Sequence, residues 1–407
     1  EKNGIRQQEE GICVKVSPLS EQSFPLPFAV PSEPGEYAVT VSFRLKEETF
    51  WAPAGYEIAF GQQVFSVPSA AAGSEACQRE EHCLEKAGAD SASLTSELDG
   101  HQSDEQSLEI IYGNYNIGAR GKDFEILFSR LNGGMVSYRY KGRELLVGMV
   151  KPNFWRAPTD NDRGNMLAFR CALWKTASLY SDARNIYDLP SVFRLENPSF
   201  REINGKLQVV YTCYLPVISA PSCKLIYVVD SDGSVQMTLD YEPGIGTDEI
   251  LKKASAGDLP EENSGQAAEE TAGEVVGQTV GEGRLPEFPE FSILLKMDAS
   301  YHQMEWYGLG PEDCYADRNC GAKLGIHRST AEQTVANYLK PQESGNHTQV
   351  RWMKVTDEQG YGLMWECDRL DVSVSPWSPH EIEEALHPTE LPPVHYTYIR
   401  AGQQIDR

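Results

Sequence analysis

A run of twelve residues gathers the side chains best suited to chemistry. The run is NFWRAPTDNDRG at residues 153–164, where two aromatic rings precede a guanidinium and clustered carboxylates and amides. Carboxylates and amides bind sugar hydroxyls, and an aromatic ring stacks on the apolar face of a pyranose. The sugar-contact candidates in this run are Trp155, Arg156, Asp160, Asn161 and Asp162.

The same run has a structural interpretation, which we favour. Arg156 would form a salt bridge to Asp160 or Asp162. Pro158 would fix a turn, and Trp155 would lie in the core. Neither a strand period nor an amphipathic helix period is visible in the run.

Two further segments mix aromatic residues with glycine and charge. Residues 305–325, EWYGLGPEDCYADRNCGAKLG, lack a dinucleotide fingerprint, because the third glycine of GxGxxG would have to replace Asp313. We expect a turn-rich loop at a sheet edge there. Residues 340–353, KPQESGNHTQVRWM, add Glu343 and Trp352 as sugar-contact candidates.

The residues alone identify no catalytic group. Glycoside hydrolysis needs two carboxylates, about 5–5.5 Å apart for retention or 6.5–9.5 Å for inversion. The chain has 60 acidic residues, so choosing a pair requires geometry. The motifs GxSxG and HExxH and the P-loop are absent from the sequence.

The charge and hydropathy of the chain exclude some classes of binding partner. The formal net charge of the 407 residues is −24, which argues against nucleic acid and anionic membranes as ligands. No apolar window reaches the roughly 18 residues of a membrane span, and the first residues lack a signal-peptide pattern. We expect a soluble, cytoplasmic protein.

Nine scattered cysteines predict free thiols rather than a disulfide framework. Cys314 and Cys320, near His302 and His327, have the residue types of a zinc site. No CxxC pair occurs and the spacing is poor for a closed site, so we expect no metal and no cofactor in this chain.

Alternating runs predict an all-β protein with two domains. Residues 1–68 contain CVKV, EYAVTVSFRL and YEIAFGQQVFSV, which indicate part of an antiparallel sandwich. Residues 69–107 lack aromatic residues and predict a disordered linker. Residues 252–283 are acidic and also lack aromatic residues, which indicates a disordered insertion, with an acidic docking segment as the alternative.

Residues 108–407 predict a large antiparallel sandwich. Hairpin turns are indicated at Asn132-Gly133, Asn204-Gly205 and Asp232-Gly233, each between alternating runs. One short helix is expected at residues 378–386, capped by Ser378 and with Pro379 in its first turn.

The clusters, in this order, resemble the last domain of bacterial β-galactosidases of glycoside hydrolase family 2. FWRAPTDNDRG is similar to the RAPxDND signature, and WYGLGPEDCYADR to the W.G.GP.E.Y.DR signature. The stretch ending at Trp352 resembles PQE.GN…RW, and DVSVSPWSPHEIEEALHPTELPP resembles that domain's ending. The resemblance covers residues 108–407, and residues 1–67 look like half of the preceding immunoglobulin-like domain.

This resemblance implies a galactose-mutarotase-like supersandwich without catalytic residues. The family's glutamates and its magnesium and sodium sites belong to upstream domains, chiefly a (β/α)₈ barrel, and its acid/base follows an asparagine. This sequence has no Asn-Glu dipeptide and ends before the family's GGDxSW-type loop. The implied partners are the barrel part of the same enzyme or a large subunit, further copies in an oligomer, and galactosides such as lactose.

Two other functions stay open from the sequence. A stand-alone mutarotase-like enzyme would use Glu343 with one of four histidines, His302, His327, His347 and His395. A non-catalytic carbohydrate-binding module would use Trp155, Trp306 or Trp352 as its platform.

Overall fold

The structure is a computed structural model that describes residues 1–68, 108–180, 198–215, 221–243 and 285–404. The predicted linker and the predicted insertion lie outside these residues. The described chain is all-β, with antiparallel sheets and a few short helices, as the sequence predicts. Within the described part, no helix is both long and apolar enough to span a membrane.

The chain divides into two compact units. The first comprises Glu1–Ser103 with Lys323–Ile326, and the second comprises Asp104–Ala322 with His327–Arg407. In the first unit, β1 (Gly35–Arg44) and β2 (Glu57–Val67) pair antiparallel and confirm two of the predicted strands. The strand predicted for CVKV is wrong. Residues 13–16 are exposed and have no strand partner among the described residues, and a strand needs a neighbour to take up its backbone hydrogen bonds.

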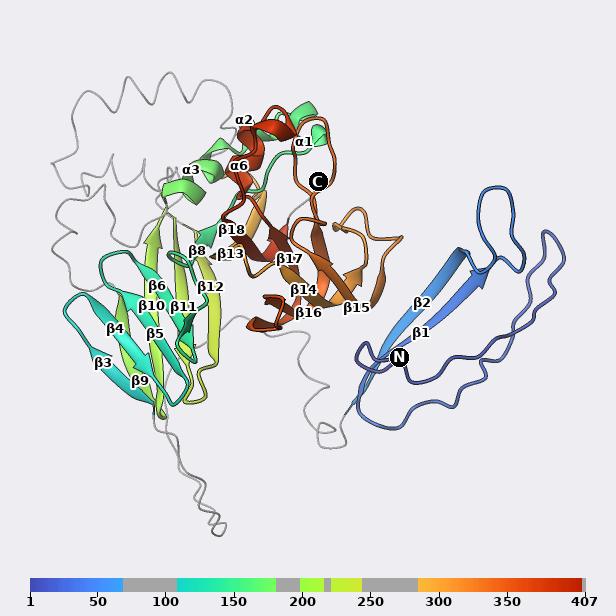
Figure 1. The fold of residues 1–407 in the computed structure, drawn as a ribbon, viewed down its shortest axis with the longest axis horizontal. Coiled ribbons are helices and arrows are strands. Elements are labelled where there is room, and N and C mark those ends of the chain that lie inside the picture. Colours follow the sequence, from blue (N-terminus) through green and yellow to red (C-terminus); the bar gives the residue numbers. More distant parts are fainter. Residues whose placement is uncertain (69–107, 181–197, 216–220, 244–284, 405–407) are drawn as a thin grey trace, which may run out of the picture. The chain divides into compact units, whose positions relative to one another are not determined.

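Two sheets of the second unit form a sandwich (Figure 1). One sheet has five strands in the order β3 (Glu109–Tyr112), β4 (Asn116–Arg120), β5 (Phe124–Ser129), β6 (Gly134–Tyr140) and β7 (Arg143–Glu144). The facing sheet has the order β12 (Val235–Glu242), β11 (Ser222–Val229), β10 (Lys206–Tyr214) and β9 (Ser199–Ile203). All three predicted hairpin turns are confirmed, since each joins consecutive paired strands.

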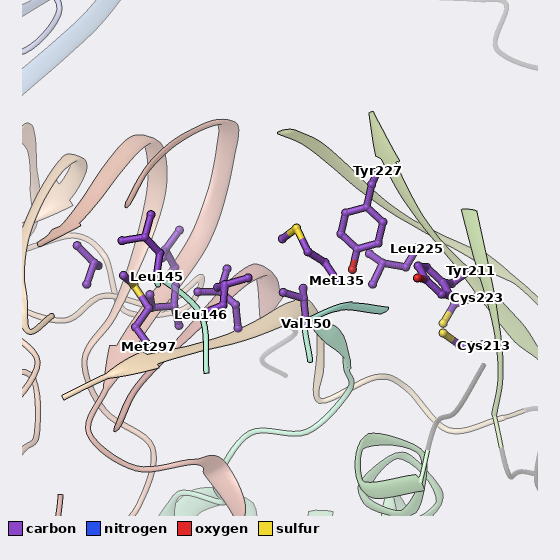
Figure 2. Close-up of a cluster of buried hydrophobic side chains, with 14 of the residues drawn as sticks. Met135, Leu145, Leu146, Val150, Tyr211, Cys213, Cys223, Leu225, Tyr227 and Met297 are labelled. Atoms are coloured by element: carbon purple, nitrogen blue, oxygen red, sulfur yellow. The ribbon is translucent and has the colours of Figure 1, made fainter. Parts of the chain in front are cut away.

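The sandwich core follows from strict alternation in its strands. In β11 every second side chain is buried, and its rings and aliphatic groups pack beside those of β10 and against those of β5 in the facing sheet. The rings of Phe128 and Tyr227 meet edge to face with centroids 5.1 Å apart. The hydroxyl of Tyr211 donates a hydrogen bond of 2.9 Å to the Ser129 carbonyl, so the buried phenol is satisfied. Figure 2 shows Tyr227 beside Met135, with Tyr211 near Cys223 in the same core.

The largest sheet has seven strands. Their order is β15 (Lys323–Thr330), β14 (Gln303–Gly310), β16 (Asn346–Thr356), β17 (Gly362–Ser375), β18 (Tyr396–Gln404), β13 (Glu290–Asp298) and β8 (Lys151–Asn153). The loop predicted for residues 305–325 is therefore only partly right. Residues 311–322 connect the two strands through turns, but residues 305–310 belong to β14 and residues 323–325 to β15. Burial of Trp306 in the core favours the first of these strands.

One face of this sheet is unusually polar. Lys296 of β13 lies opposite Tyr398 of β18, and Leu294 lies opposite both Arg400 and Lys151. Directly paired residues point to the same side of a sheet, so these side chains share one face of β8, β13 and β18. We call it the polar face. The alternate residues of β13 face the apolar core.

Short helices gather at one end of the second unit (Figure 1). The predicted helix is confirmed as α6 (Pro379–Glu384), with Ser378 as its N-cap and a capping box to Glu381. The expectation of a single helix is wrong, because α1 (Asp160–Gly164), α2 (Leu167–Arg170) and α3 (Ala172–Tyr180) follow β8. A capping box between Thr159 and Asp162 starts α1, and its T-x-x-D spacing was a readable signal.

Candidate functional site

Arg156 and Asp162 form a buried ion pair at the start of α1. Two guanidinium nitrogens of Arg156 contact the two carboxylate oxygens, one of them over 3.2 Å from Nη2 to Oδ1. Thr159 donates to the same carboxylate from its amide at 2.8 Å and from its hydroxyl at 2.9 Å. The structure thus contains the salt bridge of the structural interpretation, with Asp162 rather than Asp160 as the partner.

The other polar residues of α1 connect it to the third sequence cluster. The amide of Asp160 donates to Gln342 Oε1 at 2.7 Å, and Gln342 Nε2 donates back to the Asp160 carboxylate at 3.3 Å. Arg163 binds Asp160 at 2.9 Å and the Pro341 carbonyl at 2.9 Å. The structure therefore brings residues 153–164 and 340–353 together. Asp160 and Asn161 are themselves exposed.

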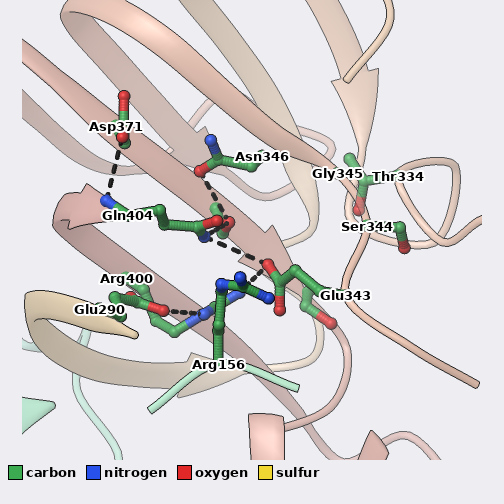
Figure 3. Close-up of polar contacts among 12 residues, drawn as sticks. Arg156, Glu290, Thr334, Glu343, Ser344, Gly345, Asn346, Asp371, Arg400 and Gln404 are labelled. Atoms are coloured by element: carbon green, nitrogen blue, oxygen red, sulfur yellow. Dashed lines mark hydrogen bonds and ion pairs between the residues drawn. The ribbon is translucent and has the colours of Figure 1, made fainter. Parts of the chain in front are cut away.

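Glu343, the residue after Gln342, belongs to a buried charge network (Figure 3). Arg400 donates to the Glu343 carboxylate over 2.5 Å and also to the carboxylate of Glu290. The three side chains, which we call the arginine bridge, are between 1% and 4% exposed. Gln404 adds a hydrogen bond of 3.2 Å to Glu343. The bridge joins β13 and β18 to the segment before β16.

The carboxylates of these networks respond differently to burial. Burial raises the pKa of Glu290 to about 7, and the nearby Glu343 adds to the rise while Arg400 opposes it. Burial also tends to raise the pKa of Asp162, but hydrogen bonds and charge from Arg156, with donors on Thr159, hold it below its usual value. A carboxyl with a pKa near 7 is suited to acid/base work only where substrate can reach it.

Substrate access is what these carboxylates lack. Four carboxylate side chains are buried among the described residues: Asp162, Glu290, Glu343 and Asp357. Each one binds an arginine, which is Arg156 for the first, Arg400 for the next two and Arg143 for the last. Paired and closed to solvent, they neutralise charge and hold segments together rather than flanking a scissile bond.

The candidate tryptophans occupy different environments. Trp155 and Trp306 are 0% exposed, so neither ring offers a face to a ligand in this folded state. The Trp155 indole donates to Glu383 at 2.7 Å. Trp352 is only partly buried, lies on β16 between Tyr307 and Glu366, and has the Lys354 ammonium 4.9 Å from its ring centroid. Sugar contact by the seven candidates stays a prediction, and three of them, Asp160, Asn161 and Trp352, are not buried.

Of the four histidines of the mutarotase-like alternative, two pack against Trp306 and two lie elsewhere. His347 stacks on Trp306 with centroids 3.9 Å apart, and burial lowers its pKa to about 3. His327 packs near the same indole at 5.3 Å. His302 lies between the carboxylates of Glu332 and Glu358, and His395 is exposed. His347 is thus neutral and closed to solvent at neutral pH.

The two cysteines considered for a zinc site also differ in burial. Cys314 is buried and its thiol contacts the Thr348 hydroxyl at 3.4 Å, whereas Cys320 is exposed. Within the described ranges, no three His, Cys, Asp or Glu side chains are grouped so that they could hold a metal ion.

Sequence reasoning missed two members of the arginine bridge, Glu290 and Arg400. Both stand in runs that otherwise read as core strands, EFSILLKMD and YTYIRAGQQ. A charged residue at a buried strand position requires a partner. The charges within these apolar runs could therefore have predicted two buried ion pairs, although not the residues with which they are formed.

Comparison with known families identifies two matches. A family model described as "Beta galactosidase small chain" matches residues 120–404. A second model, described as "Beta-galactosidase, domain 4", matches residues 1–66.

Individual relatives carry related names. A β-galactosidase of Halalkalibacterium halodurans is 32% identical over 378 residues, which are 92% of this chain and 30% of that protein. A β-galactosidase of Priestia megaterium is 30% identical over 397 residues, 96% of this chain and 31% of that protein. A "Beta-galactosidase small subunit" of Latilactobacillus sakei is 26% identical over 312 residues, 72% of this chain and 86% of that protein. The chain thus spans less than a third of the length of the first two.

Proposed function

Because the chain belongs to the β-galactosidase small-chain family, we propose that it is the non-catalytic portion of a β-galactosidase of glycoside hydrolase family 2. Its partner is a larger chain, or a larger part of the same polypeptide, that carries the (β/α)₈ barrel and the catalytic glutamates. The coverage of less than a third of the longer relatives and the likeness to a separate small subunit support this proposal.

The observation that carries the proposal is the pairing of every buried carboxylate among the described residues with an arginine. Retaining and inverting glycosidases need two carboxyl groups that face a sugar across an open cleft. Here Glu290 and Glu343 instead face one guanidinium and are 1% and 3% exposed. The arginine bridge is therefore suited to holding strands in place, and the reacting carboxylates belong to the partner.

In the assembled enzyme this chain supports the rim of the active site. The exposed groups of α1, Asp160 and Asn161, together with Trp352, are the residues proposed for sugar contact. The β-sandwich corresponds to a galactose-mutarotase-like supersandwich, and β1 with β2 to part of an immunoglobulin-like domain. The magnesium and sodium of such enzymes bind in the partner, as the resemblance to the family implies. The substrates are terminal β-D-galactosides such as lactose, and the enzyme is a cytoplasmic oligomer.

An activity assay on the purified chain tests whether it contains catalytic groups of its own. With a nitrophenyl β-D-galactoside we expect no turnover above buffer, and the Glu290→Gln and Glu343→Gln variants should behave identically. Turnover that disappears in either variant would overturn the proposal, because it would trace to a carboxylate of this chain. Polarimetry on fresh α-galactose separates the mutarotase-like alternative, for which the rate of rotation change would exceed that in buffer.

A further inference from the structure

A small pocket opens on the polar face of the seven-stranded sheet. Its volume is about 230 Å³, and it lies between β8, β13 and β18 and the start of α6. Polar side chains in its lining are Lys151, Asn153, Lys296, Ser378, His380 and Tyr398. The volume is below the roughly 300–1,000 Å³ of pockets for drug-sized ligands, so any occupant is small.

The pocket holds two ammonium groups without a carboxylate partner among the described residues. Lys151 Nζ donates one hydrogen bond, of 2.9 Å, to the Ser178 carbonyl, which leaves two of its N–H groups unused. Lys296 Nζ lies 4.1 Å from the ring centroid of Tyr396, and its hydrocarbon stem runs past Gly148. The two lysines are close enough that Lys296 lowers the pKa of Lys151, although burial contributes more to that fall.

Of the neighbouring groups, Tyr398 is hydrogen-bonded to the Glu381 carboxylate, whereas His380 adds unused hydrogen-bonding capacity. The Nδ1 atom of His380 is buried and has no hydrogen-bond partner in the structure. The charges that act on His380 are those of Lys151, Lys175 and Arg400, all cationic, and with burial they lower its pKa to about 4. Tyr398 keeps its proton at neutral pH, since burial first and then Glu381 raise its pKa to about 12.

A cationic pocket is unexpected in a chain whose formal net charge is −24. Buried charges are normally paired, and an ammonium is a compact point charge that binds phosphate oxygens well. The acidic side chains nearest to the pocket are otherwise engaged, because Glu381 caps α6 and Glu383 binds Lys175 and the Trp155 indole. Among the described residues no carboxylate forms an ion pair with Lys151 or Lys296, so both ammonium groups are open to an anion from outside.

We propose that this pocket binds a small oxyanion, either inorganic phosphate or the phosphate group of a hexose phosphate. The oxyanion would lie between the ammonium groups of Lys151 and Lys296 and accept a further hydrogen bond from His380. This inference goes beyond the proposed function, because it concerns an anion that is not a galactoside and a surface of this chain alone.

Binding to the full chain tests the proposal. Unfolding temperature and titration calorimetry are measured at neutral pH with inorganic phosphate, and with potassium chloride at equal ionic strength. We expect a saturable rise in the unfolding temperature with phosphate only. In Lys151→Gln and in Lys296→Gln the affinity should fall at least tenfold. The matched control is Lys122→Gln, since Lys122 is exposed in a turn outside the pocket and should leave the affinity unchanged.

A second arm with galactose 1-phosphate distinguishes the two sources of the anion. Tighter binding than inorganic phosphate would indicate a sugar ester, and binding of phosphate alone would indicate the free ion; both results support the pocket. Lys296 is only partly buried, so the Lys296→Gln variant keeps the test valid if Lys151→Gln does not fold. The proposal is overturned if neither anion binds saturably, or if all three variants bind phosphate as tightly as the unaltered chain.

Discussion

Replacing Arg400 by methionine removes the cation of the arginine bridge while keeping most of its packing volume. Arg400 is the common partner of Glu290 and Glu343, and all three side chains are at most 4% exposed. Water therefore cannot take over its role in the folded state. Arg400→Met leaves two buried carboxyl groups that must either stay charged without a counterion or take up protons.

The expected loss of stability is large. Removing one partner of a buried ion pair typically costs about 3–5 kcal/mol. For a domain of a few hundred residues this corresponds to a fall in unfolding temperature of roughly 10 °C. The free energy of unfolding that is lost in Arg400→Met should grow as pH rises. Loss of the guanidinium, which opposes the rise at Glu290, raises the folded-state pKa of Glu290 further, and a carboxyl with a raised pKa loses folding stability as pH increases above its unfolded value.

Urea unfolding at pH 5 and pH 8 measures both effects. We expect the free energy of unfolding of Arg400→Met to lie at least 3 kcal/mol below that of the unaltered chain at pH 8, with a smaller difference at pH 5. Combining it with Glu290→Gln and Glu343→Gln should recover much of the loss, because no charge is then buried alone. The matched control is Arg318→Met, which removes a largely exposed arginine paired with Asp313 and should cost less than about 1 kcal/mol.

The reasoning would be refuted by a loss below about 1 kcal/mol at pH 8, since that would mean that the carboxylates do not depend on Arg400. A penalty that is equal at pH 5 and pH 8 would also contradict it. In that case the loss would come from packing rather than from charge.

Further predictions concern the same region. Glu290→Gln should flatten the decline in stability between pH 4.5 and 7, because burial raises the pKa of Glu290 to about 7 and its protonated form favours folding; urea unfolding across this range would show an unchanged slope if the idea fails. Thr159→Ala removes the N-cap of α1 and should lower the free energy of unfolding by about 1 kcal/mol, whereas Thr159→Ser should retain most of it. Gly345→Ala should clearly reduce the unfolding temperature, because Gly345 has φ +75° and an added Cβ would lie 2.8 Å from the Thr334 carbonyl oxygen. An unchanged unfolding temperature would contradict this, since the segment would then accept the added Cβ without loss of stability.

Features that are set by residues close together in the chain were predictable from the sequence. The three hairpins follow from two-residue turn signals between alternating runs, and α6 follows from Ser378 as N-cap and Pro379 in the first turn. Of the helices after β8, α1 and α2 were missed because they are short, whereas α3 has nine residues and was missed because no acidic residue in its first turn marks its start. CVKV failed because alternation alone supplies no partner strand.

The candidate site was only partly predictable, because its contacts are far apart in the chain. The pair of Arg156 and Asp162 is six residues apart and was among the alternatives considered. The arginine bridge spans 110 residues from Glu290 to Arg400 and 57 from Glu343 to Arg400, and no local rule selects such partners. The polar face arises in the same way, from the register of β8, β13 and β18.

The most direct test of the account compares this chain alone with a chimera. In the chimera, the chain replaces the segment that it matches in the β-galactosidase of Halalkalibacterium halodurans. Hydrolysis of a nitrophenyl β-D-galactoside is the measurement, with folding of both proteins checked by circular dichroism. We expect turnover by the chimera and none by the chain alone, because the reacting carboxylates belong to the partner. Turnover by the isolated chain at a rate comparable to the chimera would contradict the account.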